Sequence, residues 1–287
     1  MDLPSFLTRA EALLQRVENL LPAPPPAPDW KALAHRWRRR QGRGYLEPVR
    51  HPHRIRIDDL QCVGEQKARI EQNTRQFVAG RSANNVLLTG ARGTGKSSLV
   101  KAVLHKFANK GLRLIEVDKH DLADLPEIVD LVGARPEKFI VFCDDLSFEA
   151  AEAGYVALKS VLDGSIAGMP ENLLIYATSN RRHLMPEMMA ENLQTTRADN
   201  GEIHPGETTE EKVSLSERFG LWLSFYPFDQ DAYLAICAHW LAQFGLTAKQ
   251  VEAARSEALL WSLGRGARSG RVAWQFARDY AGRHAKK

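Results

Sequence analysis

The chain alternates between short, wholly apolar runs and longer stretches whose apolar positions recur at helical spacing. The apolar runs predict buried strands at 86–89, 113–117, 139–143, 173–177 and 221–225. The periodic stretches predict helices at 65–77, 96–107, 122–131 and 155–162. Such alternation favours a mostly parallel sheet with helices on both faces. We therefore expect an α/β domain over residues 57–227.

The N-terminal part of the chain has a different pattern. Residues 5–21 carry one apolar stripe and predict an amphipathic helix, which the proline-rich segment 22–28 ends. The apolar positions that follow, as far as Trp37, predict a second short helix. We interpret residues 1–56 as an arm attached to the core and not part of it.

The C-terminal part shows only helical periodicity. Asp229 and Thr247 are suitable N-cap residues, and three helical runs follow residue 227. They predict a small helical domain over 228–287. The polar, turn-rich segment 181–214 predicts a surface insertion in the α/β domain.

The composition is that of an ordinary soluble protein. It has 287 residues, 44% of them hydrophobic and 26% charged, and no apolar run approaches the ~20 residues that span a bilayer. Its three cysteines are scattered and lack metal-binding spacing, which favours a reducing cytoplasm. Residues 29–56 hold nine Lys/Arg against two acidic residues. This segment would suit nucleic acid, although a plain solvated lead-in carries such charges too.

Residues 90–97 match the phosphate-binding pattern G-x-x-x-x-G-K-[ST] at every fixed position. The loop joins a predicted strand to a predicted helix, and this context disfavours the alternative of a simple glycine-rich turn. Its backbone N–H groups would surround a β-phosphate, Lys96 would reach the β/γ oxygens, and Ser97 would ligate Mg²⁺. The predicted nucleotide contacts are Gly90, Ala91, Arg92, Gly93, Thr94, Gly95, Lys96, Ser97 and Ser98.

Two acidic residues follow the apolar run 139–143. Beside a phosphate loop, Asp144 is predicted to hold Mg²⁺ through water, the Walker B role. Asp145 takes the position at which such enzymes usually carry a glutamate that polarises the attacking water. Aspartate is shorter by one methylene, so Glu149 is the alternative if the chain turns back. Without a phosphate-binding loop nearby, two acidic residues after a strand would indicate only a turn or a helix N-cap.

These features resemble the AAA+ ATPase superfamily, and the resemblance extends from about Ile57 to Arg283. It implies a P-loop NTPase sheet sandwiched by helices, a helical lid, and ATP with Mg²⁺ as ligands. Asn180 resembles the sensor 1 residue that contacts the attacking water or γ-phosphate, with Thr178 and Ser179 as weaker candidates. The strand before Asn180 would then lie between the loop strand and the acid strand.

Two arginine motifs extend this resemblance. Arg218 lies in a segment that resembles the arginine-finger box, which implies that it reaches the γ-phosphate of a neighbouring subunit. A homo-oligomer, hexameric by family analogy, would follow; the alternative is an arginine paired with Glu217 or Glu211. Arg268 resembles the sensor 2 residue of the lid, with Arg271 as the second choice.

The segment before the first core helix resembles the box that contacts adenine. Val63 and Gly64 would supply apolar and backbone contacts to the base, although the sequence also reads as a plain turn. The stretch from Asp58 to Lys101, together with residues 143–149, resembles an uncharacterised bacterial ATP-binding AAA+ family. That family implies a fold and a ligand but no biological role.

Three functions are compatible with the sequence. The first is an ATPase that remodels or loads a protein partner. The second is a nucleotide-dependent nucleic-acid factor that uses residues 29–56, and the third is an ATP-binding switch with little turnover. A small-molecule kinase fits the arginine motifs poorly.

Overall fold

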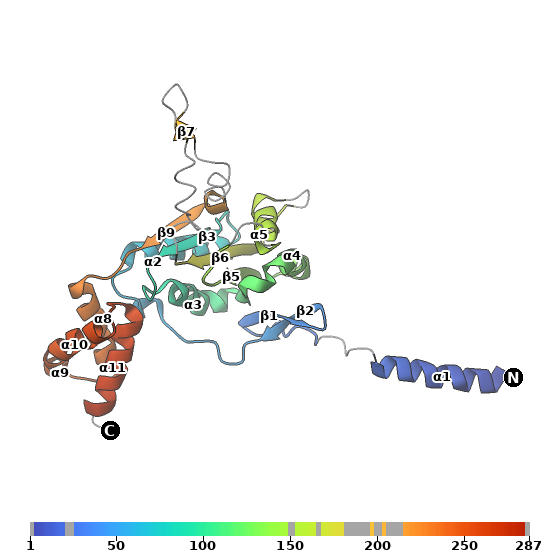
Figure 1. Cartoon of the computed structure of the whole chain (residues 1–287), viewed down its shortest axis with the longest axis horizontal. Coiled ribbons are helices and arrows are strands. Elements are labelled where there is room, and N and C mark those ends of the chain that lie inside the picture. Colours follow the sequence, from blue (N-terminus) through green and yellow to red (C-terminus); the bar gives the residue numbers. More distant parts are fainter. Residues whose placement is uncertain are drawn as a thin grey trace.

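A seven-stranded sheet forms the centre of the computed structural model (Figure 1). The structure describes residues 3–20, 26–148, 153–164, 168–180, 196–197, 203–204 and 215–284. The strands of the sheet are β1 (Ala34–Arg40), β2 (Arg43–Pro48), β3 (Val86–Gly90), β4 (Leu112–Val117), β5 (Lys138–Cys143), β6 (Leu173–Ser179) and β9 (Leu221–Phe225). Their order is β2-β1-β4-β5-β6-β3-β9, and every pair is parallel except β1 with β2. The placement of β6 between the loop strand and the acid strand is confirmed.

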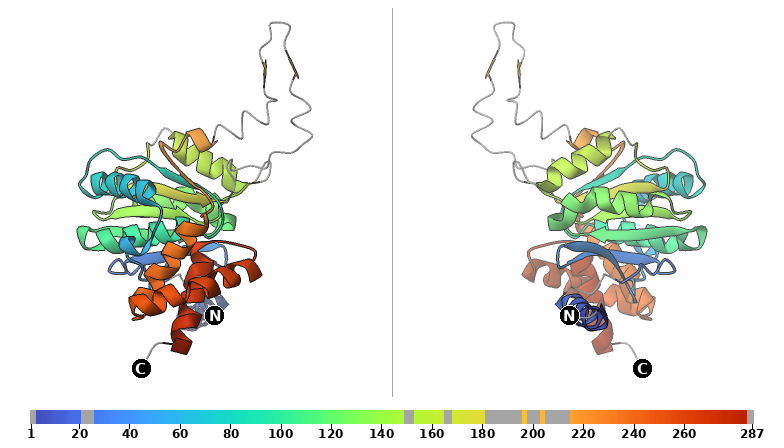
Figure 2. Two further views of the ribbon diagram at one scale, coloured as in Figure 1. Left: turned by 90° about the vertical axis from the view of Figure 1, so that its left-hand side faces the viewer. Right: turned by 90° about the vertical axis from the view of Figure 1, so that its right-hand side faces the viewer.

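Helices cover both faces of this sheet, as Figure 2 shows. One face packs against α2 (Gly64–Val78) and α3 (Lys96–Phe107). The other packs against α4 (Leu125–Gly133) and α5 (Ala153–Asp163). Three short 3₁₀ helices join these elements: η1 (Ile57–Asp59), η2 (Ala108–Lys110) and η3 (Lys119–Asp124). The predicted α/β fold class is confirmed.

The sandwich explains why the central strands read as continuous apolar runs. In β3, Val86 and Leu88 pack with α2 and α3, whereas Leu87 packs with α4 and α5. All three side chains are fully buried. Because side chains alternate between the faces of a strand, a strand buried on both faces needs apolar residues at every position.

The C-terminal helices form a second hydrophobic core. They are α8 (Gln230–Gln243), α9 (Ala248–Ala253), α10 (Arg255–Gly264) and α11 (Gly270–His284). Tyr233 and Phe276 are fully buried at its centre. The Asp229 side chain accepts a hydrogen bond from the Ala232 N–H, and Thr247 forms a capping box, so both predicted caps are confirmed. The single helix expected after Thr247 is divided into α9 and α10.

The prediction of a second N-terminal helix is wrong. Residues 34–48 form the β1–β2 hairpin, and β1 extends the main sheet by pairing with β4. Trp37 is buried, packs with Leu46 in the core, and donates from Nε1 to the Asp124 carboxylate. These tertiary contacts decide the outcome, because a short run with few apolar residues is ambiguous between helix and strand. This hairpin therefore belongs to the core sheet and not to an arm.

The rest of the N-terminal region and the insertion are described only in part. The predicted first helix is present as α1 (Leu3–Leu20), which lies apart from the other elements in Figure 1. Most of the proline-rich segment lies outside the described residues. Of the predicted insertion at 181–214, the structure describes only β7 (Thr196–Arg197) and β8 (Ile203–His204), which pair antiparallel.

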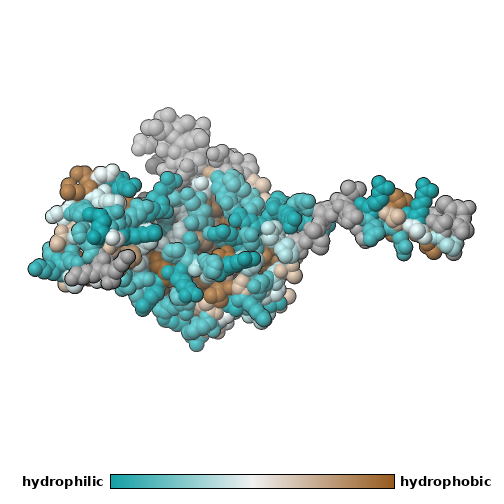
Figure 3. Space-filling view, turned by 90° about the horizontal axis from the view of Figure 1, so that it is seen from below, coloured by the Kyte–Doolittle hydropathy of each residue, from teal (hydrophilic) through white to brown (hydrophobic). Residues whose placement is uncertain are grey.

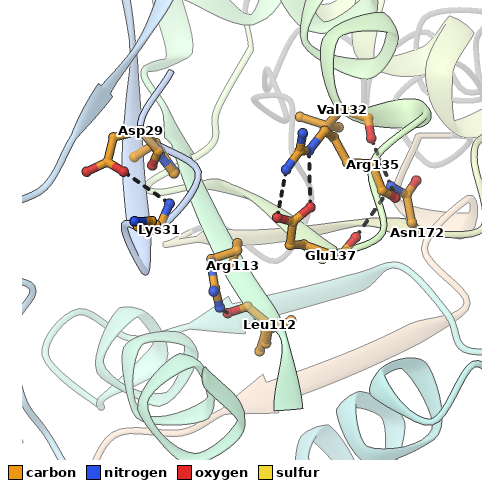
Figure 4. Close-up of polar contacts among 9 residues, drawn as sticks. Asp29, Lys31, Leu112, Arg113, Val132, Arg135, Glu137 and Asn172 are labelled. Carbon is orange, nitrogen blue, oxygen red and sulfur yellow. Dashed lines mark hydrogen bonds and ion pairs between the residues drawn. The ribbon is translucent and has the colours of Figure 1, made fainter. Parts of the chain in front are cut away.

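Polar contacts tie the loops together at the amino ends of β5 and β6 (Figure 4). The Arg135 guanidinium makes two hydrogen bonds to the Glu137 carboxylate, at 2.9 and 3.1 Å, which lower the pKa of Glu137. It also stacks 4.4 Å from the centre of the Trp30 ring. The Asn172 amide donates to the Val132 carbonyl at 2.8 Å, just before α4 ends. This edge is thus a structural anchor for the segment that leads into β1.

Candidate functional site

The phosphate-loop residues 90–97 lie between the end of β3 and the first turn of α3. Gly90, Gly93 and Gly95 have φ angles of 123°, 75° and 98°, which side chains disfavour. A Cβ on Gly90 would also collide with the Phe225 carbonyl oxygen of the neighbouring strand. The glycines of the motif are therefore required by this backbone path, and the loop ends at a helix N-terminus, where N–H groups favour anions.

Lys96 is the charged centre of the loop. Its Nζ donates to the Gly90 carbonyl at 2.7 Å, to the Ala91 carbonyl at 2.8 Å and to Asn180 Oδ1 at 3.1 Å. The residue is 6% exposed, and this burial lowers the pKa of the ammonium, although the Asp144 and Asp145 carboxylates oppose the shift. A buried cation held only by neutral oxygens is suited to a strongly charged anion.

Asp144 follows β5 and receives two hydrogen bonds on the same oxygen. Ser97 Oγ and Thr178 Oγ1 each donate to Asp144 Oδ1 at 2.6 Å. The contacts join α3, β5 and β6, because parallel strands bring their carboxyl ends to one edge of the sheet. A hydroxyl and a carboxylate side by side form a ligand set that Mg²⁺ takes together with phosphate and water oxygens.

Asp145 adopts a left-handed backbone conformation, with a φ of 53°. Its N–H donates to Thr178 Oγ1 at 2.9 Å, and its carboxylate accepts a hydrogen bond from the Asn180 amide. The backbone of the next residue, Leu146, donates to the Thr178 carbonyl at 2.6 Å. Aspartate tolerates this conformation better than most residues do, and the contacts hold its exposed carboxylate beside Asn180.

Thr178 is a site residue whose role the sequence did not indicate. Its hydroxyl links the two acids by donating to Asp144 and accepting from the Asp145 N–H. It therefore positions both carboxylates, whereas sequence reasoning offered it only as a weak alternative to Asn180. A sequence signal did exist, because side chains alternate between the two sides of a strand. Thr178 therefore points to the side opposite Ala177, which is buried in the core.

These groups line a cleft of about 640 Å³ between the sheet and the C-terminal helices. The cleft also has apolar lining residues. They comprise Ile55, Leu60, Val63, Phe228, Ile236 and Trp240. Val63 is thus a lining residue, whereas Gly64, the first residue of α2, is not. His53 also lines the cleft and had no sequence signal of its own.

The phosphate loop also contacts the start of α11. The Gly270 N–H donates to the Gly93 carbonyl at 2.8 Å, and a Cβ on Gly93 would stand 2.8 Å from the Ser269 side chain. This contact brings Arg271 to the cleft, where it is a lining residue. Arg268, preferred from the sequence, instead lines a second pocket beside Leu259 and Leu263. The geometry therefore favours Arg271 over Arg268.

The remaining loop positions divide between the two pockets. Arg92 and Thr94 line both, whereas Ser98 lines only the main cleft and Ala91 only the second. The Ala91 N–H is hydrogen-bonded to the Phe225 carbonyl at 3.2 Å. The Ala91 N–H is therefore occupied by a structural hydrogen bond, whereas the Ala91 carbonyl accepts a hydrogen bond from Lys96.

Arg218 does not line the cleft of its own chain. It lies before β9, its side chain is 23% exposed, and its guanidinium is ion-paired with the Asp163 carboxylate at the end of α5. Of the two partners considered from the sequence, Glu211 lies outside the described residues, so that pairing stays a prediction. Glu149 lies outside the described residues, so its predicted role stays a prediction.

The fold is similar to that of solved AAA+ structures. Aeropyrum pernix ORC1 in complex with DNA matches with a TM-score of 0.52 and 16% identity, over 80% of this chain and 63% of that one. A Thermotoga maritima RuvB variant matches with a TM-score of 0.47 and 15% identity, over 78% and 63%. The E. coli MS115-1 HORMA:CdnC:Trip13 complex matches with a TM-score of 0.49 and 13% identity, over 78% and 90%. The chain has the AAA+ ATPase fold.

The chain can also be placed in a sequence family. Residues 30–284 match the family described as "Protein of unknown function (DUF815)", and the chain belongs to it. No curated protein matches the sequence. The chain spans 63% of the length of the RuvB and ORC1 chains that it resembles. Among the described helices, none has the length and apolar character needed to cross a membrane.

Proposed function

We propose that this chain binds ATP with Mg²⁺ in the cleft and hydrolyses it. The observation that carries the proposal is the convergence of Lys96, Ser97 and Asp144 beside the N-terminus of α3. The Lys96 ammonium is buried among carbonyl oxygens and suits the β/γ oxygens of a triphosphate. The apolar lining residues of the cleft suit a base, with Val63 as one contact.

Ser97 and Asp144 would hold the magnesium ion in this scheme. The ion would neutralise charge on the phosphates. Asp145 would orient and polarise the attacking water, with Asn180 beside it. Glu149 stays the alternative for this role. Arg271 would contact the phosphate end from the lid.

We further propose that hydrolysis depends on assembly of identical chains. Arg218 does not line its own cleft and is paired with Asp163, so a phosphate contact by this residue would be made to a neighbouring subunit. The fold supports an oligomer, and a hexamer follows the family analogy. Remodelling or loading of a protein partner, within the cytoplasm, is the corresponding biological role.

A second candidate is an ATP-binding switch with little turnover. It is favoured by Asp145, which is shorter than glutamate and is held in a left-handed conformation by Thr178 and Asn180. Both candidate functions require ATP binding. They differ in the rate at which phosphate is released.

Titration calorimetry with ATP and Mg²⁺ tests the shared claim. Lys96→Ala should weaken binding at least about a hundredfold, because a buried charge-assisted contact is lost. Lys106→Ala is the matched control, since Lys106 lies on the same helix but pairs with Glu71 outside the cleft. Equal affinity of Lys96→Ala and the control would show that the loop is structural.

A further inference from the structure

The β1–β2 hairpin presents one face that is rich in arginine. Residues paired across an antiparallel ladder point to the same side. The register pairs Arg36 with Glu47, Arg38 with Tyr45 and Arg40 with Arg43. The hairpin basic face is therefore made of Arg36, Arg38, Arg40, Arg43 and Tyr45 together with one acid, Glu47, and all four arginines are exposed.

The opposite face of the hairpin is occupied by the core. Trp37 and Leu46 are directly paired and fully buried there. The hairpin is thus fixed flat against the body and cannot enter a groove of a duplex as a free ribbon. Figure 3 looks at the molecule from the side on which β1 and β2 lie in Figure 1, and the surface of the body there is largely hydrophilic.

The end of the hairpin carries an unbalanced positive charge. Arg36 pairs with Glu116 at 2.7 Å and Arg38 with Glu47 at 3.3 Å. Arg40 and Arg43 face each other directly, and neither has an ion pair among the described residues. Like charges directly opposite each other destabilise a ladder. A bound anion would relieve this repulsion.

The basic surface continues from β2 toward the nucleotide cleft. Arg50, Arg54 and Arg56 are exposed in the segment that ends at η1, and His53 and Ile55 of the same segment line the cleft. Every strong base between residues 32 and 66 is arginine and none is lysine. Arginine binds phosphate oxygens bidentately and stacks on bases, whereas lysine acts as a point charge.

We propose that the hairpin basic face binds the phosphate backbone of a single-stranded nucleic acid. Alternate residues of a strand lie about 7 Å apart, so Arg36, Arg38 and Arg40 form a straight row of cations on a rigid sheet. Tyr45 lies beside this row, half-buried, as a stacking surface for a base. Cationic rows with an interleaved aromatic side chain are typical of single-strand binding surfaces. The proposal goes beyond ATP binding and does not depend on it.

Fluorescence anisotropy of a labelled oligothymidylate tests this proposal on the full chain. An oligonucleotide of about 20 nucleotides exceeds the usual site size of such surfaces. Arg40→Gln with Arg43→Gln should weaken binding about tenfold or more at ~0.1 M salt and reduce the slope of log affinity against log salt by about 1.4. Arg81→Gln with Lys249→Gln removes the same charge from exposed positions elsewhere and should leave affinity and slope unchanged.

Folding of each variant is checked by its thermal transition, and Arg50→Gln with Arg54→Gln provides a second test outside the ladder. This second variant should also weaken binding and reduce the salt slope. Wild-type affinity in both arginine variants, or no binding by the wild type, would overturn the proposal. So would tighter binding of a duplex of equal length, or displacement of the strand by polyglutamate as efficient as displacement by unlabelled oligothymidylate.

Discussion

The side-chain amide of Asn180 donates a hydrogen bond to the carboxylate of Asp145. The oxygen of the same Asn180 amide accepts a hydrogen bond from Lys96 Nζ at 3.1 Å. One amide therefore connects the cation of the phosphate loop to Asp145, the acid proposed to activate water. Removal of this connection should affect the chemical step more than the binding of nucleotide.

We predict that Asn180→Ala lowers ATP turnover about a hundredfold while ATP affinity changes less than about tenfold. The expected loss is of the size seen when one preorganised hydrogen-bond donor is removed from an active site. Phosphate release at saturating ATP and calorimetric affinity measure the two quantities. Turnover equal to that of the wild type would contradict the role given to Asn180.

A second prediction separates the two lid arginines. Arg271→Ala should weaken ATP binding about tenfold or more, because Arg271 lines the cleft and its guanidinium can form a charge-assisted contact with phosphate. Arg268→Ala should stay within about twofold of the wild type, since Arg268 lines the second pocket. Calorimetric titration of both variants measures the difference. The reverse ranking would restore the assignment expected from the sequence.

A third prediction concerns the ion pair between Arg218 and Asp163. Arg218→Ala should leave ATP affinity unchanged and reduce turnover by about 10³-fold or more, the size of effect known for arginine fingers. Asp163→Asn breaks the same ion pair but keeps the guanidinium, so it should retain turnover. If both variants lose turnover equally, Arg218 acts only through its pairing within the subunit.

A fourth prediction concerns two glycines with positive φ. Gly80→Ala should lower the free energy of unfolding by only about 1 kcal/mol, because the site has open space and the cost is backbone strain. Gly90→Ala should lower it by about 3 kcal/mol or more, since the new Cβ meets the Phe225 carbonyl. Urea denaturation measures both. Equal losses would show that the β3–β9 approach tolerates a side chain.

Much of the fold follows from local pattern. The strands of the α/β sandwich were predictable because burial on both faces leaves uninterrupted apolar runs, as in Val86–Leu88. The loop 90–97 was predictable because its glycines match a fixed motif, and Gly90, Gly93 and Gly95 adopt the positive φ angles that such a loop requires. By contrast, the β1–β2 hairpin owes its form to partners far along the chain, such as Asp124 for Trp37.

The site shows the same division. Lys96 and Ser97 were predicted from the spacing of the loop motif, and Asp144 from its position directly after an apolar strand. The role of Thr178 depends on the geometry of the β5–β6 edge, which no motif specifies. The choice between Arg268 and Arg271 depends on how the first turn of α11 meets Gly93, and sequence spacing alone cannot resolve a single helical turn.

The most direct test of the central claim is ATP turnover measured against protein concentration, for the wild type and for Asp145→Asn. Asparagine tolerates the positive φ of this position, so the variant removes the charge with little backbone strain. We predict a specific activity that rises with protein concentration in the wild type and collapses in the variant. Absence of turnover at every concentration, with ATP still bound, would contradict the proposed ATPase and favour the binding switch.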